Sequence, residues 1–192
     1  MSVDVGKSLV MRRQVVLSGV GGQGILFLSR LLAEAAIAAG FPVLTSETHG
    51  MAQRGGVVVS HLKVGGFDSP LVRTGRADLL LVLKEENVAL HREFLADDGS
   101  LVVNAPVPTD AGPRVRVHAV DADAIALAAG APHAVNLVLL GFALARVGGG
   151  TAGGFFCTAE EVREALSRRQ GAGGSRLAAS LFALDLGIAH GT

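Results

Sequence analysis

The sequence predicts a Rossmann-like three-layer α/β domain with a mostly parallel sheet and a helical C-terminal region. Three observations lead to this fold class. A short apolar run is followed at once by a glycine-rich turn and then by apolar positions at helical spacing. Further short apolar runs, which are typical of buried strands, recur along the first half of the chain. Beyond residue 121 the apolar pattern is helical.

The first elements form a predicted β-α-β unit. Residues 14–18, "QVVLS", are a compact apolar strand, and the apolar residues from Gly22 to about Ala39 recur at helical spacing. Gly40 ends this helix, because glycine is favoured just beyond a helix C-terminus. The segment 41–46, "FPVLTS", then provides the second strand.

A polar, glycine-bearing segment follows the second strand and interrupts the simple alternation of strands and helices. More regular patterns resume after it. We expect a strand at 57–64, a buried strand at 78–84, a helix from Glu85 to about Ala96, a strand that ends at Asn104 and an edge strand within 114–120.

Four helices are predicted in the last third of the chain, at 121–129, 133–147, 158–169 and 175–188. Thr158 is the expected N-cap of the third, because its hydroxyl can accept an otherwise unpaired backbone N–H. No linker is long enough to divide the chain. We therefore expect one domain over residues 1–192, with a short flexible lead at 1–13 and a mainly helical region at 121–192.

Composition excludes several classes of function. The 192 residues carry no net charge, which indicates neither a nucleic-acid-binding surface nor attraction to an anionic membrane. No apolar stretch reaches the roughly 20 residues that cross a bilayer, and the first residues lack the apolar core of a signal peptide. We expect a cytoplasmic protein with no nucleic-acid or membrane partner.

Side chains for independent catalysis are scarce. Cys157 is the only cysteine, so this chain alone can form no internal disulfide and cannot hold an iron–sulfur cluster, which takes about four thiolates. The histidines lack metal-ligand spacing, and Ser18 and Ser60 have no recognisable base and acid partners. We predict no catalytic and no metal-binding residue here, and a structural role for Asn136 on its helix.

The first glycine turn has the spacing G-x-G-x-x-G, with Gly19, Gly21 and Gly24 at its three positions and Gly22 and Gln23 between them. Such a turn lets a phosphate approach the backbone at the positive end of a helix. Glu47 lies about 20 residues further on, where a ribose-binding acid would follow the second strand. A tight corner between a strand and a helix explains the same glycines without any ligand.

A second loop carries polar side chains next to glycines. They converge after the second strand, and an arginine and a histidine beside a helix N-terminus would favour a phosphate or a carboxylate. His49 alternatively caps a turn. The candidate binding residues of this segment are Glu47, His49, Gln53, Arg54, Gly55 and Gly56.

Taken together, "GVGGQGILFLSRLLAEAA" and "SETHGMAQRGGVVVSHLKVG" resemble the γ-type subunits of the 2-oxoacid:ferredoxin oxidoreductases, and most closely the small (β) subunits of the indolepyruvate branch. The likeness extends through "RADLLLVLK", "GSLVVNAP" and "NLVLLGFAL" and so covers roughly residues 14–145. Enzymes of this family oxidatively decarboxylate 2-oxoacids on thiamine diphosphate, reduce ferredoxin through iron–sulfur clusters and release an acyl-CoA.

The resemblance implies a division of labour between subunits. A large (alpha) subunit would hold thiamine diphosphate, Mg and the iron–sulfur clusters, and this chain would hold no cofactor alone. The backbone at Gly21, Gly22 and Gly24 would receive an anion such as a CoA phosphate, with Gln23 hydrogen-bonding at the mouth. His49, Gln53 and Arg54 would face the shared site for 2-oxoacid and CoA, and ferredoxin would be met through the complex.

Two other functions stay open at this point. G-x-G-x-x-G with Glu47 is compatible with a free-standing NAD(P)- or nucleotide-binding reductase. A γ subunit for pyruvate or branched-chain 2-oxoacids is the other alternative, because the pocket that selects the substrate would belong mainly to another chain.

Overall fold

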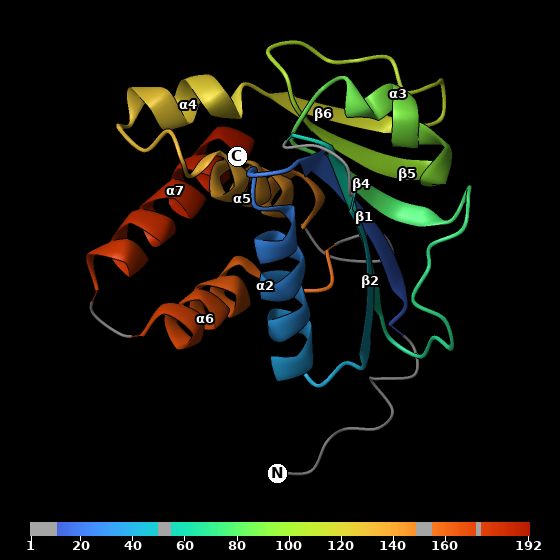
Figure 1. Cartoon of the computed structure of the whole chain (residues 1–192), viewed down its shortest axis with the longest axis horizontal. Helices are drawn as coiled ribbons and strands as arrows, with labels where there is room; N and C mark the ends of the chain where they lie inside the picture. Colours follow the sequence, from blue (N-terminus) through green and yellow to red (C-terminus); the bar gives the residue numbers. More distant parts are fainter. Residues whose placement is uncertain (1–10, 50–54, 149–154, 172–173) are drawn as a thin grey trace.

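A six-stranded sheet runs through the molecule, with most of the helices on one side of it (Figure 1). The computed structural model describes residues 11–49, 55–148, 155–171 and 174–192. The strand order is β2-β3-β1-β4-β5-β6. The strands are β1 (Arg13–Val20), β2 (Val43–His49), β3 (Val57–Val64), β4 (Ala77–Val82), β5 (Leu95–Asn104) and β6 (Arg116–Val120).

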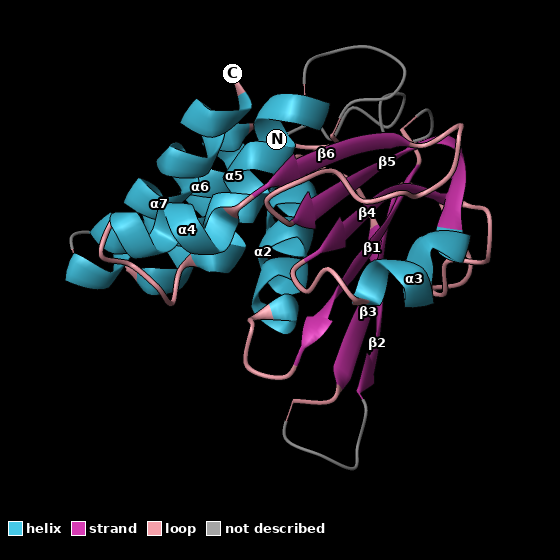
Figure 2. Cartoon of the chain, turned by 90° about the horizontal axis from the view of Figure 1, so that it is seen from above, coloured by secondary structure: helices cyan, strands magenta, loops and turns pink. Residues whose placement is uncertain are grey.

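The helices cover the two faces of the sheet unequally, as Figure 2 shows: only α3 lies on the far face. One apolar core joins the sheet to the other five helices, and a second, smaller core lies under α3 and the loops beside it. This arrangement confirms the predicted three-layer α/β class, with a thin third layer. The helices are α2 (Ile25–Ala38), α3 (Asn87–His91), α4 (Ala122–Ala128), α5 (Val135–Val147), α6 (Ala159–Gln170) and α7 (Ser175–Gly191).

The sheet is mostly parallel, as predicted, but its first unit is modified. Strands β1, β4, β5 and β6 are parallel neighbours, whereas β3 is antiparallel to both β1 and β2. Strand β2 therefore runs in the direction of β1 without touching it. The connection from β2 to β3 is short, and a short connection joins antiparallel neighbours, so β3 takes the place beside β1.

Some predicted boundaries hold and others shift; the strand predicted at 41–46, for example, spans Val43–His49. Strand β3 has the predicted bounds, whereas the helix expected from Glu85 to Ala96 stops at His91 and a 3₁₀ turn continues to Phe94. Leu95 already pairs with Ala77 as the start of β5, so sheet pairing overrides the helical pattern. Residues 1–10 of the predicted lead lie outside the described residues, and β1 begins within that lead.

The predicted N-cap of α6 is confirmed. Glu161 donates its backbone N–H to Thr158 Oγ1 at 3.2 Å, and Thr158 donates its own N–H to Glu161 Oε2 at 2.7 Å. This reciprocal capping box satisfies two backbone donors that the first turn of a helix leaves free.

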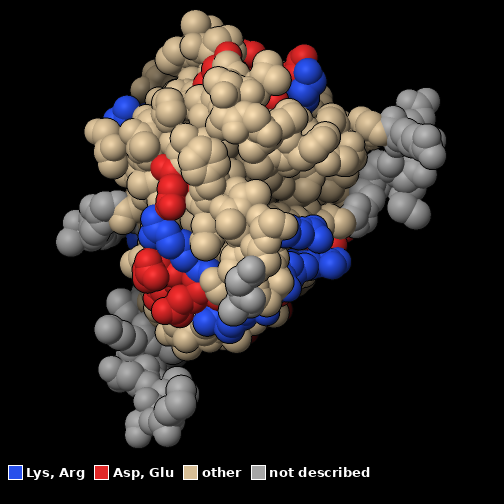
Figure 3. Space-filling model, turned by 90° about the vertical axis from the view of Figure 1, so that its left-hand side faces the viewer, with Lys and Arg blue, Asp and Glu red and all other residues tan. Residues whose placement is uncertain are grey.

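Two ion pairs join α6 to α7 and α2, and two more lie within α6 itself. Figure 3 shows acidic and basic side chains side by side at the height of α6, below a wide area without charge. Each pair is exposed or half-exposed, so each contributes at most about 1 kcal/mol. The pairs are Arg163–Glu160, Arg163–Asp185, Arg168–Glu164 and Arg169–Glu34. No helix of the described residues combines the length and the hydropathy needed to cross a bilayer.

Glycines allow α5 and α7 to pack closely. A Cβ atom on Gly187 would collide with the carbonyl oxygen of Val138, and one on Gly141 would collide with that of Leu184. We expect Gly187→Ala to lower the free energy of unfolding by about 1–3 kcal/mol, the usual cost of overpacking a core. Urea denaturation measures the change.

Gly174→Ala is the matched control, because Gly174 precedes α7 and nothing lies within 4 Å of its added Cβ. Equal stability of the two variants would contradict the close approach of α5 and α7.

Candidate functional site

Two glycine loops that are far apart in the sequence meet at one edge of the sheet. Gly21 donates its backbone N–H to the carbonyl oxygen of Gly56 at 3.0 Å. In the sheet register, Gly19 pairs with Val58, which in turn pairs with His49. The carboxyl ends of β1 and β2 and the start of β3 therefore lie at the same edge, where open α/β sheets bind their ligands.

Part of the second loop is not described. Gln53 and Arg54 lie outside the described residues, as does the side chain of His49, although its backbone pairs in β2. Gly55 has an exposed backbone with φ 84°, and Gly56 is half-buried against the first turn. The predicted binding roles of these five residues stay predictions.

The first turn ends at Gly24, which is the N-cap of α2 and has φ 80° and ψ 27°. No side chain caps this helix, and no acidic residue lies in its first turn. Gly21 and Gly22 are exposed immediately before it. The positive end of α2 is therefore open to an anion from solvent or from a partner, which satisfies the geometric condition for a phosphate-binding turn.

Gln23 faces into the protein. Its Oε1 accepts the backbone N–H of Val20 at 2.9 Å, and its Nε2 donates to the carbonyl oxygen of Leu83 at 3.3 Å. The oxygen of the amide therefore closes the turn on the end of β1, and its nitrogen joins the turn to the loop that follows β4. Contact between Gln23 and a ligand would require one of these bonds to open, so its predicted role at the mouth stays a prediction.

Glu47 is separated from the glycine turn by a whole strand. It pairs with Ser60 of β3, and Ser60 pairs with Leu17 of β1. Two strand spacings amount to about 9–10 Å. In a dinucleotide-binding sheet the strand that carries the ribose-binding acid is the direct neighbour of β1. The observed strand order therefore disfavours NAD binding by Gly19, Gly21, Gly24 and Glu47.

A buried polar cluster under the glycine turn could not be recognised in the sequence. Asn87 donates from Nδ2 to Ser18 Oγ at 3.1 Å and to the carbonyl oxygen of Gly19 at 2.9 Å. Ser18 Oγ also lies 2.9 Å from His91 Nδ1. Because Ser18 is fully buried and its oxygen already accepts a hydrogen bond, this serine–histidine pair holds α3 against β1 and does not present a nucleophile.

Two histidines of this region share Phe94. The His91 ring is stacked on Phe94 at 6.2 Å between ring centroids, and the His61 ring meets Phe94 edge-on at 5.2 Å. Burial lowers the pKa of His61, and the nearby charges of His91 and Lys63 lower it further. Burial also lowers the pKa of His91, although a hydrogen bond to the Asn87 backbone and the charge of Glu93 raise it in part.

No other part of the described chain offers a cofactor site. Cys157 is buried, and burial with the nearby Glu161 charge raises the pKa of its thiol far above the ordinary range, so it is an unreactive packed side chain. Among the described residues, no three histidine, cysteine, aspartate or glutamate side chains group as a metal site. The Asn136 side chain lies against Gly24 at the start of α2, and its predicted structural role stays a prediction.

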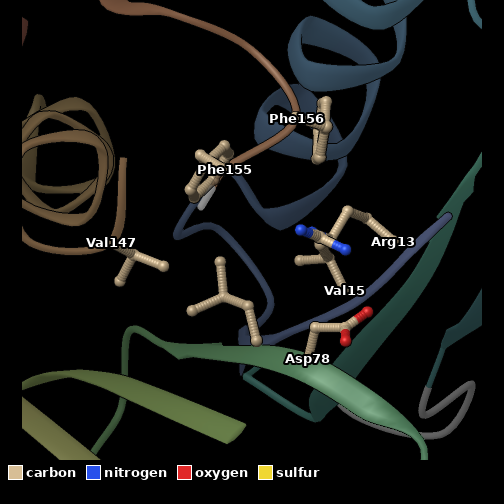
Figure 4. Close-up of a pocket in the computed structure, with 7 residues that line it drawn as sticks. Arg13, Val15, Asp78, Val147, Phe155 and Phe156 are labelled. Atoms are coloured by element: carbon tan, nitrogen blue, oxygen red, sulfur yellow. The ribbon is translucent and has the colours of Figure 1, made fainter. Parts of the chain in front are cut away.

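A shallow recess lies at the other end of β1 and is separate from the glycine loops. Figure 4 shows Phe155 and Phe156 on one side of it and Arg13 and Asp78 on another. Its lining is mostly apolar and comes from the start of β1 and β4 and the segments around α5 and α6. Because it adjoins the amino ends of the parallel strands, it has no part in the site described above.

The geometry defines a class of protein: an α/β domain with a glycine-turn site at the carboxyl edge of its sheet. Residues 14–190 match the family described as pyruvate ferredoxin/flavodoxin oxidoreductase. The chain belongs to this family, which confirms the resemblance stated from the sequence.

Relatives of the chain are small subunits. It is 37% identical over 151 residues to the indolepyruvate oxidoreductase subunit IorB of Archaeoglobus fulgidus, covering 68% of this chain and 75% of that one. It is 31% identical to the subunit of the same name from Pyrococcus horikoshii, covering 91% of this chain and 93% of that one.

Solved structures share the fold. A keto/oxoacid ferredoxin oxidoreductase γ subunit from Geobacter sulfurreducens superposes with a TM-score of 0.73 at 24% identity, over 93% of this chain and 98% of that one. A 2-oxoglutarate:ferredoxin oxidoreductase from Magnetococcus marinus, bound to 2-oxoglutarate, coenzyme A and succinyl-CoA, gives 0.78 at 22% identity over 94% of this chain. This chain spans only 31% of that much longer one.

The start of α2 generates a first prediction. Gly24→Ala places a Cβ against the Asn136 amide. It also puts an alanine in the left-handed backbone conformation of Gly24, which costs about 1–2 kcal/mol for an ordinary residue. We expect a lower melting temperature, only partly restored when Asn136→Ala removes the collision. Gly66→Ala, which meets nothing within 4 Å, is the control. Full restoration in the double variant would show that the backbone conformation carries no cost.

The histidine cluster generates a second prediction. Because the folded pKa values of His61 and His91 lie below the usual 6.5, the unfolded chain binds more protons just below that pH. Stability is therefore complete above about pH 6.5 and falls as the pH drops through the lowered values. Urea denaturation from pH 7.5 to 5 should show this loss.

His91→Gln should flatten the dependence of unfolding free energy on pH. His133→Gln removes an exposed histidine outside the cluster and controls for the loss of an imidazole as such. An unchanged slope in the His91 variant would rule out its part in the pH dependence.

Proposed function

We propose that this chain is the small subunit of an indolepyruvate-type 2-oxoacid:ferredoxin oxidoreductase. The observation that carries the proposal is the likeness to IorB subunits at 31–37% identity, which reaches 91% of the chain. The family match over residues 14–190 and the joined glycine loops support it. In this role the chain completes a site whose redox chemistry belongs to a larger partner subunit.

The side chains of this subunit do not fit the family's redox cofactors. One cysteine in the whole sequence cannot supply the roughly four thiolates of a cluster, and that cysteine is buried in the core. Thiamine diphosphate with its Mg and the iron–sulfur clusters therefore belong to the large subunit in this proposal. This chain oxidises no 2-oxoacid by itself.

What the chain contributes is an electropositive, preformed backbone surface. The exposed backbone of Gly22 and the uncapped start of α2 receive an anionic group, such as a phosphate of CoA, next to Gly21, whose own N–H is already donated to Gly56. Gly56 accepts the Gly21 N–H and so holds the second loop against this turn. In this proposal His49, Gln53 and Arg54 contact the same ligand or the large subunit. These groups bind and orient the substrates, and ferredoxin is met through the assembled complex.

Reconstitution tests the assignment. The purified chain is mixed with the large subunit from the same organism, and viologen reduction is followed with indolepyruvate and CoA. We expect no activity from either chain alone and CoA-dependent reduction from the mixture. A panel of indolepyruvate, phenylpyruvate, pyruvate and 2-oxoisovalerate assigns the substrate, and preference for pyruvate or 2-oxoisovalerate would replace the indolepyruvate assignment. Micromolar NAD(P)H binding with hydride turnover by the isolated chain would overturn the subunit role itself.

Arg54 provides a residue-level prediction. Arg54→Ala should reduce the activity of the complex by about tenfold or more, the loss expected when a charge-assisted hydrogen bond is removed, with little change in the melting temperature of the isolated chain. Arg176→Ala, which truncates an exposed arginine on α7, is the matched control. A collapse in stability with unchanged specific activity would contradict a role in binding.

A further inference from the structure

Two cationic side chains lie over one aromatic ring at the opposite end of the sheet from the glycine loops, and a third is near enough for its charge to lower the pKa of one of them. Lys63 lies near the end of β3 and pairs with Gln14 at the start of β1. Its Nζ is 5.0 Å from the centre of the Phe67 ring, and the Arg12 guanidinium carbon is 4.2 Å from the same centre. Arg73, from the loop after β3, is the third cation of this cluster.

Lys63 is unusual because it is buried without an acidic partner among the described residues. Only 7% of the residue is exposed. Burial lowers the pKa of its ammonium, and the charges of Arg73 and Arg12 lower it further. The three positive charges therefore repel one another in a partly desolvated place, and an isolated cluster of this kind costs stability unless an anion completes it.

The ammonium can be reached from outside. No polar side-chain atom of the described residues is sealed from solvent without a hydrogen-bond partner, and no described residue accepts a hydrogen bond from Lys63 Nζ. Asp68, next to Phe67 in the sequence, is exposed and forms no ion pair with the three cations. The charge of the cluster is therefore open and uncompensated within the described chain.

The backbone, and not the side chains alone, brings the cluster together. Gly65 has φ 104°, and a Cβ at this position would collide with the carbonyl oxygen of Met11. Its N–H is donated to the carbonyl oxygen of Pro42 at 2.8 Å. This close approach holds the loop after β3 against the start of β1, which places Phe67 beside Arg12 before any ligand arrives.

We propose that Lys63, Arg12 and Arg73 form a binding site for a phosphate group. A carboxylate would leave two of the three charges unmatched, whereas a phosphate carries close to two negative charges and several acceptor oxygens. Planar guanidinium groups suit such oxygens, and the ammonium adds a point charge beneath them. The site lies about 17 Å along β3 from the glycine turn, so it stands whether or not the proposed function holds.

Calorimetric titration of the full chain with inorganic phosphate, at constant ionic strength, tests the site. We expect saturable binding, and the component that belongs to this site is the one that the cluster variants weaken, whatever the glycine turn binds. Lys63→Met, Arg12→Gln and Arg73→Gln should each weaken it by about tenfold or more, because each removes a charge-assisted hydrogen bond. Arg176→Gln, which removes an exposed charge on α7, should bind as the unaltered chain does.

Thermal unfolding supplies a second readout. Without phosphate, Lys63→Met should melt at or above the temperature of the unaltered chain, since the repulsion is relieved. Phosphate should raise the melting temperature of the unaltered chain more than that of this variant. Should Lys63→Met fail to fold, the exposed Arg12 and Arg73 variants decide the question by titration.

A parallel titration with AMP identifies the source of the phosphate group. Tighter binding of AMP assigns the site to a phosphate ester of a small molecule, and tighter binding of inorganic phosphate assigns it to the free ion. Heats that do not saturate, or equal affinities in the unaltered chain and all three cluster variants, would overturn the site.

Discussion

Four consecutive residues, from Ser18 in β1 to Gly21 just after it, find hydrogen-bond partners in three different parts of the chain. The carbonyl oxygen of Ser18 accepts from the Leu83 N–H, and that of Gly19 accepts from Asn87. Val20 donates its N–H to the side chain of Gln23, and Gly21 donates its N–H to the carbonyl oxygen of Gly56. Because buried backbone groups must be paired, this strand end determines how the glycine turn, the β4–α3 loop and the second glycine loop lie together.

The inserted strand β3 gives the sheet two chemically different ends. At its start it carries Gly56 to the glycine turn, where backbone groups and a helix end can meet an anion. At its far end it carries Lys63 to Arg12 and Phe67, where side-chain cations gather. Because β3 lies between β1 and β2, Glu47 is a whole strand away from β1. The glycine motif typical of dinucleotide binding is therefore present without an acidic residue at the end of the neighbouring strand.

The family relationship agrees with the scarcity of reactive side chains in the described part of the chain. The fold recurs both as a separate γ subunit and as about a third of a much longer oxidoreductase chain. The apolar core is large, Ser18 is fully buried and Cys157 is unreactive. The groups of the described chain that are available to an anion lie instead at the two ends of the sheet.

The sequence by itself determined the features that depend on near neighbours in the chain. Strand 57–64, the cap at Thr158 and the order of the elements follow from apolar periodicity and from local hydrogen bonding. Only the tertiary structure decided which strand stands beside β1, where the helix after Glu85 ends, and that Ser18, Asn87 and His91 meet. These outcomes depend on pairing and burial between residues far apart in the chain, from Ala77 and Leu95 to Ser18 and His91, which no local pattern records.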